Sequence, residues 1–186
     1  MMRRAAAIAA ACLLALPPAD TYLAATMERR LLIQLPAMLV LGALAGWRPA
    51  GGGAAPRAWR SGDLAALAFA VGAMLFWMIP RSLDLAARSR PADAALLLSV
   101  FAAGFALSRS LPHLSFAIPM TLGVQAAAML TALGIVYLHF PGLICTAYTL
   151  AQQRVAGAGL VRAAPVAWIL LWGWALRRLA VARSAY

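Results

Sequence analysis

The sequence predicts an all-α integral membrane protein, a helical bundle with about six transmembrane helices. Of its 186 residues, 65% are hydrophobic and only 11% are charged, and the mean hydropathy is +0.84. Soluble domains carry about a quarter charged residues. The apolar residues form successive runs, with arginines and helix-breaking residues between them. A water-soluble fold could not cover its surface with so few charges, whereas a lipid-facing surface needs none.

The N-terminal segment, residues 1–23, has two interpretations. A basic pair, a short apolar run and two prolines follow one another in residues 3–18, which is the pattern of a signal peptide. The alternative, which we favour, is an uncleaved first transmembrane helix that extends to about Leu23. Cleavage would leave five spans. In either case residues 24–186 form one membrane domain.

The five remaining spans are predicted at residues 31–46, 64–79, 94–107, 115–137 and 155–176. Glycines within these runs would let the helices pack closely. The Gly- and Pro-rich residues 48–63 predict a loop that ends at Asp63, the expected N-cap of the next span. Residues 143–150 are apolar but too short to cross a bilayer, so we expect a re-entrant or interfacial helix there.

The stretch from Phe76 to Leu85 lies between two apolar runs and opens a segment with five charges, residues 81–93. A helix that leaves the bilayer, a short amphipathic turn at the interface and a helix that re-enters would explain this pattern. We expect the function to lie at this interface. Trp77, Pro80 and Asp84 are its candidate contact residues.

The net charge of +11 comes from 16 basic and five acidic residues, and every basic residue is an arginine. The arginines lie at the ends of apolar runs, which favours contact with lipid headgroups over nucleic acid. With six spans both termini share one side, which carries nine arginines against six on the other. The arginine-rich side is expected in the cytoplasm, which predicts a multi-pass protein of the bacterial inner membrane with a cytoplasmic C-terminus.

No catalytic motif is present, so the sequence predicts no enzyme and no catalytic residue. The carboxylates occur singly, and we expect Asp84 and Asp93 to cap helices or to pair with neighbouring arginines of residues 81–90. Cys12 and Cys145 are not expected to form a disulfide. Arg162 falls inside the last span. Either it is a functional charge within the membrane, or the helix starts near Leu160 and the side chain reaches the interface, which we favour.

Four soft ligands are expected on the outer side of the membrane: Met27, Met78, His139 and Cys145. Thioether, thiol and imidazole groups suit Cu(I), so these residues are a candidate copper site. They come from four separate segments without metal-site spacing, and methionine is a common space-filling residue in apolar helices. The absence of a bound cofactor is therefore the favoured expectation.

Four segments resemble, in order and spacing, the CtaG-type cytochrome c oxidase assembly proteins. They are Met27 with Leu31-Leu32 and Pro36 to Gly42; Phe76 to Pro80 with Leu83 to Ala86; Phe101 to Phe105; and Gln152-Gln153 with Ala156-Gly157. The resemblance covers most of the chain from Met27 onward. It implies a membrane helical domain that delivers copper to a haem-copper oxidase, and it adds Gln152 and Gln153 to the candidate contact residues.

The departures from the family concern its histidines, which are its expected metal ligands. Thr26 and Arg30 replace the opening pair, Met78 replaces the histidine after the tryptophan, and residues 92–97 lack the paired histidines. Ala151 replaces an aspartate. The resemblance thus implies an assembly factor that docks on cytochrome c oxidase with most of its metal ligands lost. The alternatives are a permanent structural subunit of a respiratory complex and a small transporter. The absence of intramembrane acids and of paired broken helices disfavours the transporter.

Overall fold

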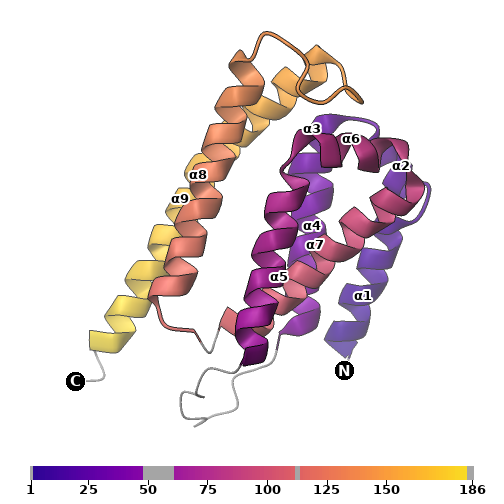
Figure 1. Cartoon of the computed structure of the whole chain (residues 1–186). Coiled ribbons are helices and arrows are strands. Elements are labelled where there is room, and N and C mark those ends of the chain that lie inside the picture. The colour runs from indigo at the N-terminus through magenta and orange to yellow at the C-terminus, as the bar shows by residue number, and fades with distance from the viewer. Residues whose placement is uncertain (1, 48–60, 112–113, 184–186) are drawn as a thin grey trace.

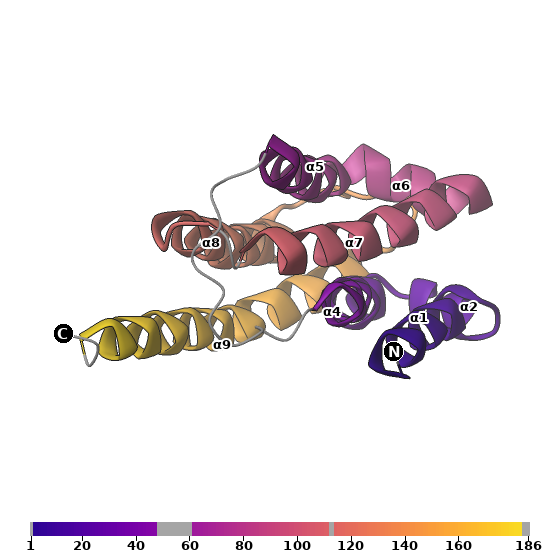
Figure 2. The ribbon, with the colours of Figure 1, turned by 90° about the horizontal axis from the view of Figure 1, so that it is seen from below.

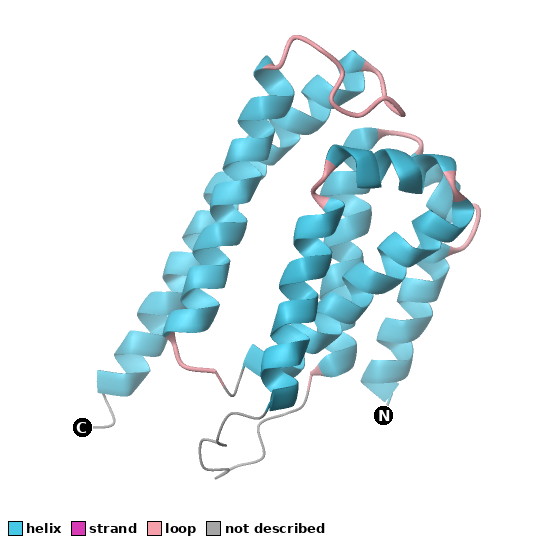
Figure 3. Cartoon of the chain, in the orientation of Figure 1, coloured by secondary structure: helices cyan, strands magenta, loops and turns pink. Residues whose placement is uncertain are grey.

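The computed structural model describes residues 2–47, 61–111 and 114–183, and within them every regular element is a helix (Figures 1 and 3). The helices are α1 (Met2–Ala15), α2 (Ala19–Ala24), α3 (Met27–Arg29), the π-helical turn η1 (Arg30–Gln34), α4 (Leu35–Gly46), α5 (Ser61–Trp77), α6 (Pro80–Arg88), α7 (Arg90–Ser110), α8 (Ala117–His139) and α9 (Leu150–Arg183). The all-α prediction is confirmed.

Four described helices are long and apolar enough to cross a membrane: Met27–Gly46, Arg90–Ser110, Ala117–His139 and Leu150–Ala180. A fifth span is possible if α5 and α6 count as one broken span, bent by 79°. The helix α1 has 14 residues, about 21 Å at 1.5 Å per residue, which is shorter than the hydrocarbon core of a bilayer. The start of α1 and the end of α9 lie at the same end of the bundle (Figure 1).

The helices α4 and α7 form the closest pair of one half of the molecule, and two glycines allow it. A Cβ at Gly42 would collide with the backbone carbonyl of Phe101, and a Cβ at Gly104 would collide with that of Leu39. The two backbones are therefore in direct contact, as the glycines predict. The helices α1 and α5 pack on opposite sides of this pair (Figure 2).

The helices α8 and α9 form a separate hairpin that uses the same device. A Cβ at Gly134 would lie 2.9 Å from the backbone N of Val161, and a Cβ at Gly157 would lie 2.9 Å from the carbonyl oxygen of Gly134. The hairpin joins the other helices through contacts of α9 with α3 and η1. The two halves are thus packed internally and meet near one end (Figure 1).

Several helix boundaries differ from the predicted ones. The first helix ends at Ala15 instead of continuing to Leu23, because Pro17 and Pro18 interrupt it before α2. The helix α5 begins at Ser61, which places Asp63 in its first turn and not at the N-cap. Residues 48–60 of the predicted loop lie outside the described residues. Residues 143–149 form a loop and not a separate helix.

Candidate functional site at the polar cap

The end of the bundle opposite the termini collects most of the polar groups that connect its segments. We call it the polar cap and define it as residues 16–30, 78–93 and 140–153. It contains α2, α3, α6, the first turn of α7, the α8–α9 loop and the first turn of α9 (Figure 1). The amphipathic turn predicted after Ile79 is the helix α6, which lies across this end.

Arg30 is the central charge of the polar cap. Thr26 accepts a hydrogen bond from the backbone N of Arg29 and so starts the helix that carries Arg30 inward. The Arg30 side chain is only 2% exposed and forms an ion pair with Asp93 of α7. Asp93 was expected to cap a helix or to pair with an arginine of residues 81–90; it lies in the first turn of α7, and its ion pair is with Arg30 instead. Burial of a charge is costly unless it is paired, so the ion pair is what allows Arg30 to lie here.

Tyr148 is the second group that interacts with the Arg30 side chain. The guanidinium hydrogen-bonds the phenol oxygen, and the phenol donates to the carbonyl of Ala24 at 3.4 Å. Burial raises the pKa of Tyr148, although the charge of Arg30 acts in the opposite direction. The Nε of Arg30 is buried and has no hydrogen-bond partner among the described residues.

Gln34, one turn further along, joins three helices. Its Nε2 donates to the carbonyl of Leu14 at 3.3 Å and to Oδ1 of Asp20 at 2.8 Å. The Leu14 carbonyl is in the last turn of α1, where no intrahelical donor is available. Arg30 and Gln34 bound a π-helical turn, a local distortion that often occurs at functional sites. Pro36, which lacks an N–H, follows this turn.

Asp84 of α6 binds the α8–α9 loop. Its carboxylate accepts hydrogen bonds from the backbone N and the hydroxyl of Thr146, both at 2.9 Å, and from the backbone N of Ala147 at 3.0 Å. Burial would raise the pKa of Asp84, but these hydrogen bonds and the charge of nearby Arg88 together lower it. Arg88 also donates to the Thr146 hydroxyl. Asp84 is thus an anchor between two segments of the cap.

The two glutamines of the family resemblance hold the beginning of α9. Thr149 and Gln152 form a reciprocal capping box, with both bonds at 3.2 Å. Gln153 is buried, accepts from the backbone N of Ile144 at 2.8 Å and donates to the carbonyl of Gly142 at 3.3 Å. The helix therefore starts at Leu150, and the predicted starts near Val155 and Leu160 were both wrong.

The candidate copper ligands all lie at the cap end, but their environments differ. Met27 and Cys145 are buried in the same hydrophobic cluster, Met78 is partly buried and His139 is exposed. The Cys145 thiol lies 4.0 Å from the carbonyl oxygen of Pro80. Burial raises its pKa to about 11. Two of the four candidates therefore belong to the apolar cluster, whereas the imidazole of His139 lies at the surface.

Trp77 and Pro80 connect α5 to the cap. Trp77 is largely buried and donates from Nε1 to the hydroxyl of Ser99 on α7 at 2.7 Å. Pro80 begins α6 after the 79° bend. Of the predicted contact residues, Trp77 and Gln153 therefore have internal roles, whereas Asp84 and Gln152 bind neighbouring cap segments.

Gln34 and Tyr148 were not singled out by the sequence, and Arg30 was named only as a replacement for a family histidine. Arg30 and Gln34 lie four residues apart in an apolar helix, a spacing that places two polar groups on one face and could have indicated an internal polar contact. Tyr148 gave no comparable signal. Compared with protein families, curated proteins and solved structures, the chain matches none.

Proposed function

We propose that this chain is a non-enzymatic membrane protein that docks on a cytochrome c oxidase of the bacterial inner membrane and assists its assembly without carrying copper itself. In this proposal α1 is a short sixth membrane helix and the C-terminus is cytoplasmic. The resemblance to the CtaG-type proteins supports the choice of partner. Three of its four segments contribute to the polar cap or adjoin it: the regions around Met27, Trp77 and Gln152.

The main support for docking is that the part of the α8–α9 hairpin away from the cap has no other described helix packed against its exposed apolar side chains. Below the cap, α8 and α9 pack on each other and leave apolar side chains exposed, with Ile169 at 71% and Leu170 at 68%. A Cβ at Gly173 would meet no heavy atom within 4 Å. An exposed glycine among large apolar residues allows a partner helix to approach closely.

Arg162 supports a protein partner on the same helix. It lies 12 residues after Leu150, about 18 Å along α9 at 1.5 Å per residue, and its side chain is exposed. An arginine within a membrane span is costly and usually pairs with an acid or a carbonyl. In our proposal, an acidic residue of an oxidase helix supplies this partner.

The test is purification in a mild detergent followed by mass spectrometry of the proteins that co-purify. We expect oxidase subunits to co-purify with the parent protein and to be recovered in much smaller amounts with Gly173→Leu. Gly72→Leu is the matched control, because a Cβ at Gly72 on α5 also meets nothing within 4 Å. Migration of the parent protein as a free monomer, or equal recovery with both variants, would reject docking through α9.

The proposed absence of copper is tested separately by metal analysis of protein purified under reducing conditions. We expect substoichiometric copper, unchanged by Met27→Leu. One copper per chain, lost in Met27→Leu and in Cys145→Ser, would instead support a copper-delivering factor. A permanent structural subunit differs from an assembly factor in one respect: it would remain in the mature, active oxidase.

A further inference from the structure

A polar pocket of about 190 Å³ opens in the cap between α2, α6 and the start of α7. Its charged lining residues are Arg30, Arg88, Arg90, Asp20 and Asp93. Three arginines and two aspartates leave a formal charge of +1. Both aspartates already bind inside the protein, Asp93 to Arg30 and Asp20 to Gln34. Arg88 lies near the carboxylate of Asp84 and donates to Thr146, so the exposed Arg90 is the main source of the pocket's remaining positive charge.

Arg30 lies at the wall of the pocket, and its Nε is a buried donor without a partner among the described residues. A buried N–H that lacks an acceptor destabilises the folded protein. Arginine has five N–H donors, and here the ion pair and Tyr148 use only part of that capacity. A ligand with several acceptor oxygens would satisfy the remaining donor.

The N-terminus of α7, a 21-residue helix, also borders the pocket through Ser89, Arg90 and Asp93. Ser89 is at the N-cap position but its side chain makes no capping hydrogen bond. The partial positive charge of a helix N-terminus favours an anion. The buried Arg30 donor and this helix end are independent observations, and both indicate an anionic ligand with multiple oxygens.

We propose that the pocket binds the phosphate of an anionic phospholipid headgroup. Arginine pairs with phosphate through two parallel hydrogen bonds, and basic pockets between membrane helices suit such headgroups. The exposed Arg88 and Arg90 make the first contact, and Arg30 together with the α7 N-terminus binds the phosphate oxygens.

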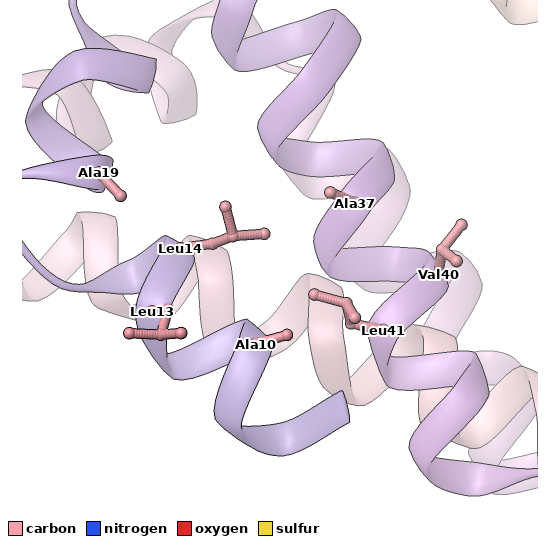
Figure 4. Close-up of a pocket in the computed structure, with 7 residues that line it drawn as sticks. All are labelled: Ala10, Leu13, Leu14, Ala19, Ala37, Val40 and Leu41. Atoms are coloured by element: carbon pink, nitrogen blue, oxygen red, sulfur yellow. The ribbon is translucent and has the colours of Figure 1, made fainter. Parts of the chain in front are cut away.

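An apolar groove beside the pocket favours a lipid over free phosphate. It has a volume of about 520 Å³ and lies between α1 and α4, where Leu14 and Leu41 project into the space between the helices (Figure 4). Ala19 of α2 lines the groove, and the next residue, Asp20, lines the polar pocket. An acyl chain along the groove would therefore lie next to a headgroup in the pocket.

The experiment measures binding of phosphatidylglycerol to the full chain in mixed detergent micelles, with phosphatidylcholine and inorganic phosphate in parallel. We expect saturable binding of phosphatidylglycerol. In Arg88→Gln/Arg90→Gln its affinity falls roughly tenfold or more, the scale expected when charge-assisted contacts to phosphate are lost. Arg81→Gln is the matched control, because Arg81 is an exposed arginine of α6 outside the pocket. Circular dichroism checks that each variant is folded.

Equal binding of phosphatidylglycerol and phosphatidylcholine would overturn the proposal, as would an equal loss in Arg81→Gln. Inorganic phosphate could bind in a way that depends on Arg88 and Arg90 while phosphatidylglycerol does not bind. That result would support an anion site but reject a phospholipid as its ligand. The variant Leu14→Ala/Leu41→Ala removes apolar side-chain atoms that line the groove. It should weaken binding of phosphatidylglycerol and leave binding of inorganic phosphate unchanged. None of these outcomes depends on association with an oxidase.

Discussion

Arg30 and Asp93 form an ion pair that joins the first turns of two membrane-length helices, Met27–Gly46 and Arg90–Ser110. Arg30 is 2% exposed and the Asp93 side chain is 16% exposed. Below the cap the same two helices are in backbone contact at Gly42 and Gly104. The pair thus holds the cap end of a helix crossing whose middle is held by glycines.

Loss of one partner should destabilise the protein strongly. Arg30→Met leaves Asp93 buried without its counter-charge, which costs about 3–5 kcal/mol for a buried pair. We expect the midpoint of thermal unfolding in detergent to fall accordingly. Arg154→Met is the control, because Arg154 is an exposed arginine near the start of α9.

The double variant Arg30→Met/Asp93→Leu separates the cost of the unpaired acid from the contribution of the pair. Apolar replacement of both partners of a buried ion pair is often neutral or stabilising, so the double variant should recover much of the stability lost in Arg30→Met. If it is less stable than Arg30→Met, the ion pair is not the reason for the loss.

The helix crossing itself should be sensitive to a single methyl group. In Gly42→Ala the new Cβ meets the backbone carbonyl of Phe101, which cannot move away as a side chain could. We expect a loss of about 1–3 kcal/mol, the usual range for overpacking. In Gly72→Ala the Cβ enters open space, and helix propensity predicts a gain of up to about 1 kcal/mol. Thermal unfolding of both variants is the measurement, and similar shifts in both would contradict the close contact.

Cys145 should be protected from alkylation while the protein is folded. Its thiol is buried and its pKa is raised to about 11, so the reactive thiolate is only about one part in a thousand at pH 8. In the background of Cys12→Ser, N-ethylmaleimide should label Cys145 much more slowly in mild detergent than in denaturing detergent. The native rate should increase as the pH is raised toward 11. Equal rates in the two detergents would show that the thiol is accessible.

The contact of Asp84 with the α8–α9 loop should depend on pH. The folded-state pKa of Asp84 is lowered, so its contribution to stability is present above the unfolded pKa of about 3.9. It is lost as the pH falls through the lower folded-state value. Asp84 is partly exposed, so the expected effect is about 1 kcal/mol or less.

Asp84→Asn tests this contact, because the amide retains one oxygen acceptor but not the charge. We expect it to be slightly less stable than the parent at pH 6, and the difference to become smaller as the pH is lowered toward 3. Thermal unfolding at both pH values is the measurement. A difference that is as large at pH 3 as at pH 6 would show that the charge of Asp84 does not contribute.

Some of the candidate site could be predicted from the sequence, since the charged segment after Ile79 and the glutamine pair both belong to the polar cap. Thr149 and Gln152 also form a local capping signal that fixes the start of α9, although the prediction placed that start several residues later. The partner of Asp93 could not be predicted, because several arginines are closer in sequence than Arg30. The environment of Cys145 likewise depends on Pro80, which is distant in sequence, and on Tyr137 of α8, which precedes the loop that holds Cys145.

The sequence by itself determined the helical class and the apolar spans, because hydrophobic runs and helix breakers act locally. Only the tertiary structure decided which charge is buried, which carboxylate pairs with it and which helices stand apart as a hairpin. These features depend on segments separated by tens of residues, such as Arg30 and Asp93, being brought within contact distance. A charge at a helix end becomes an internal group only when other helices cover it.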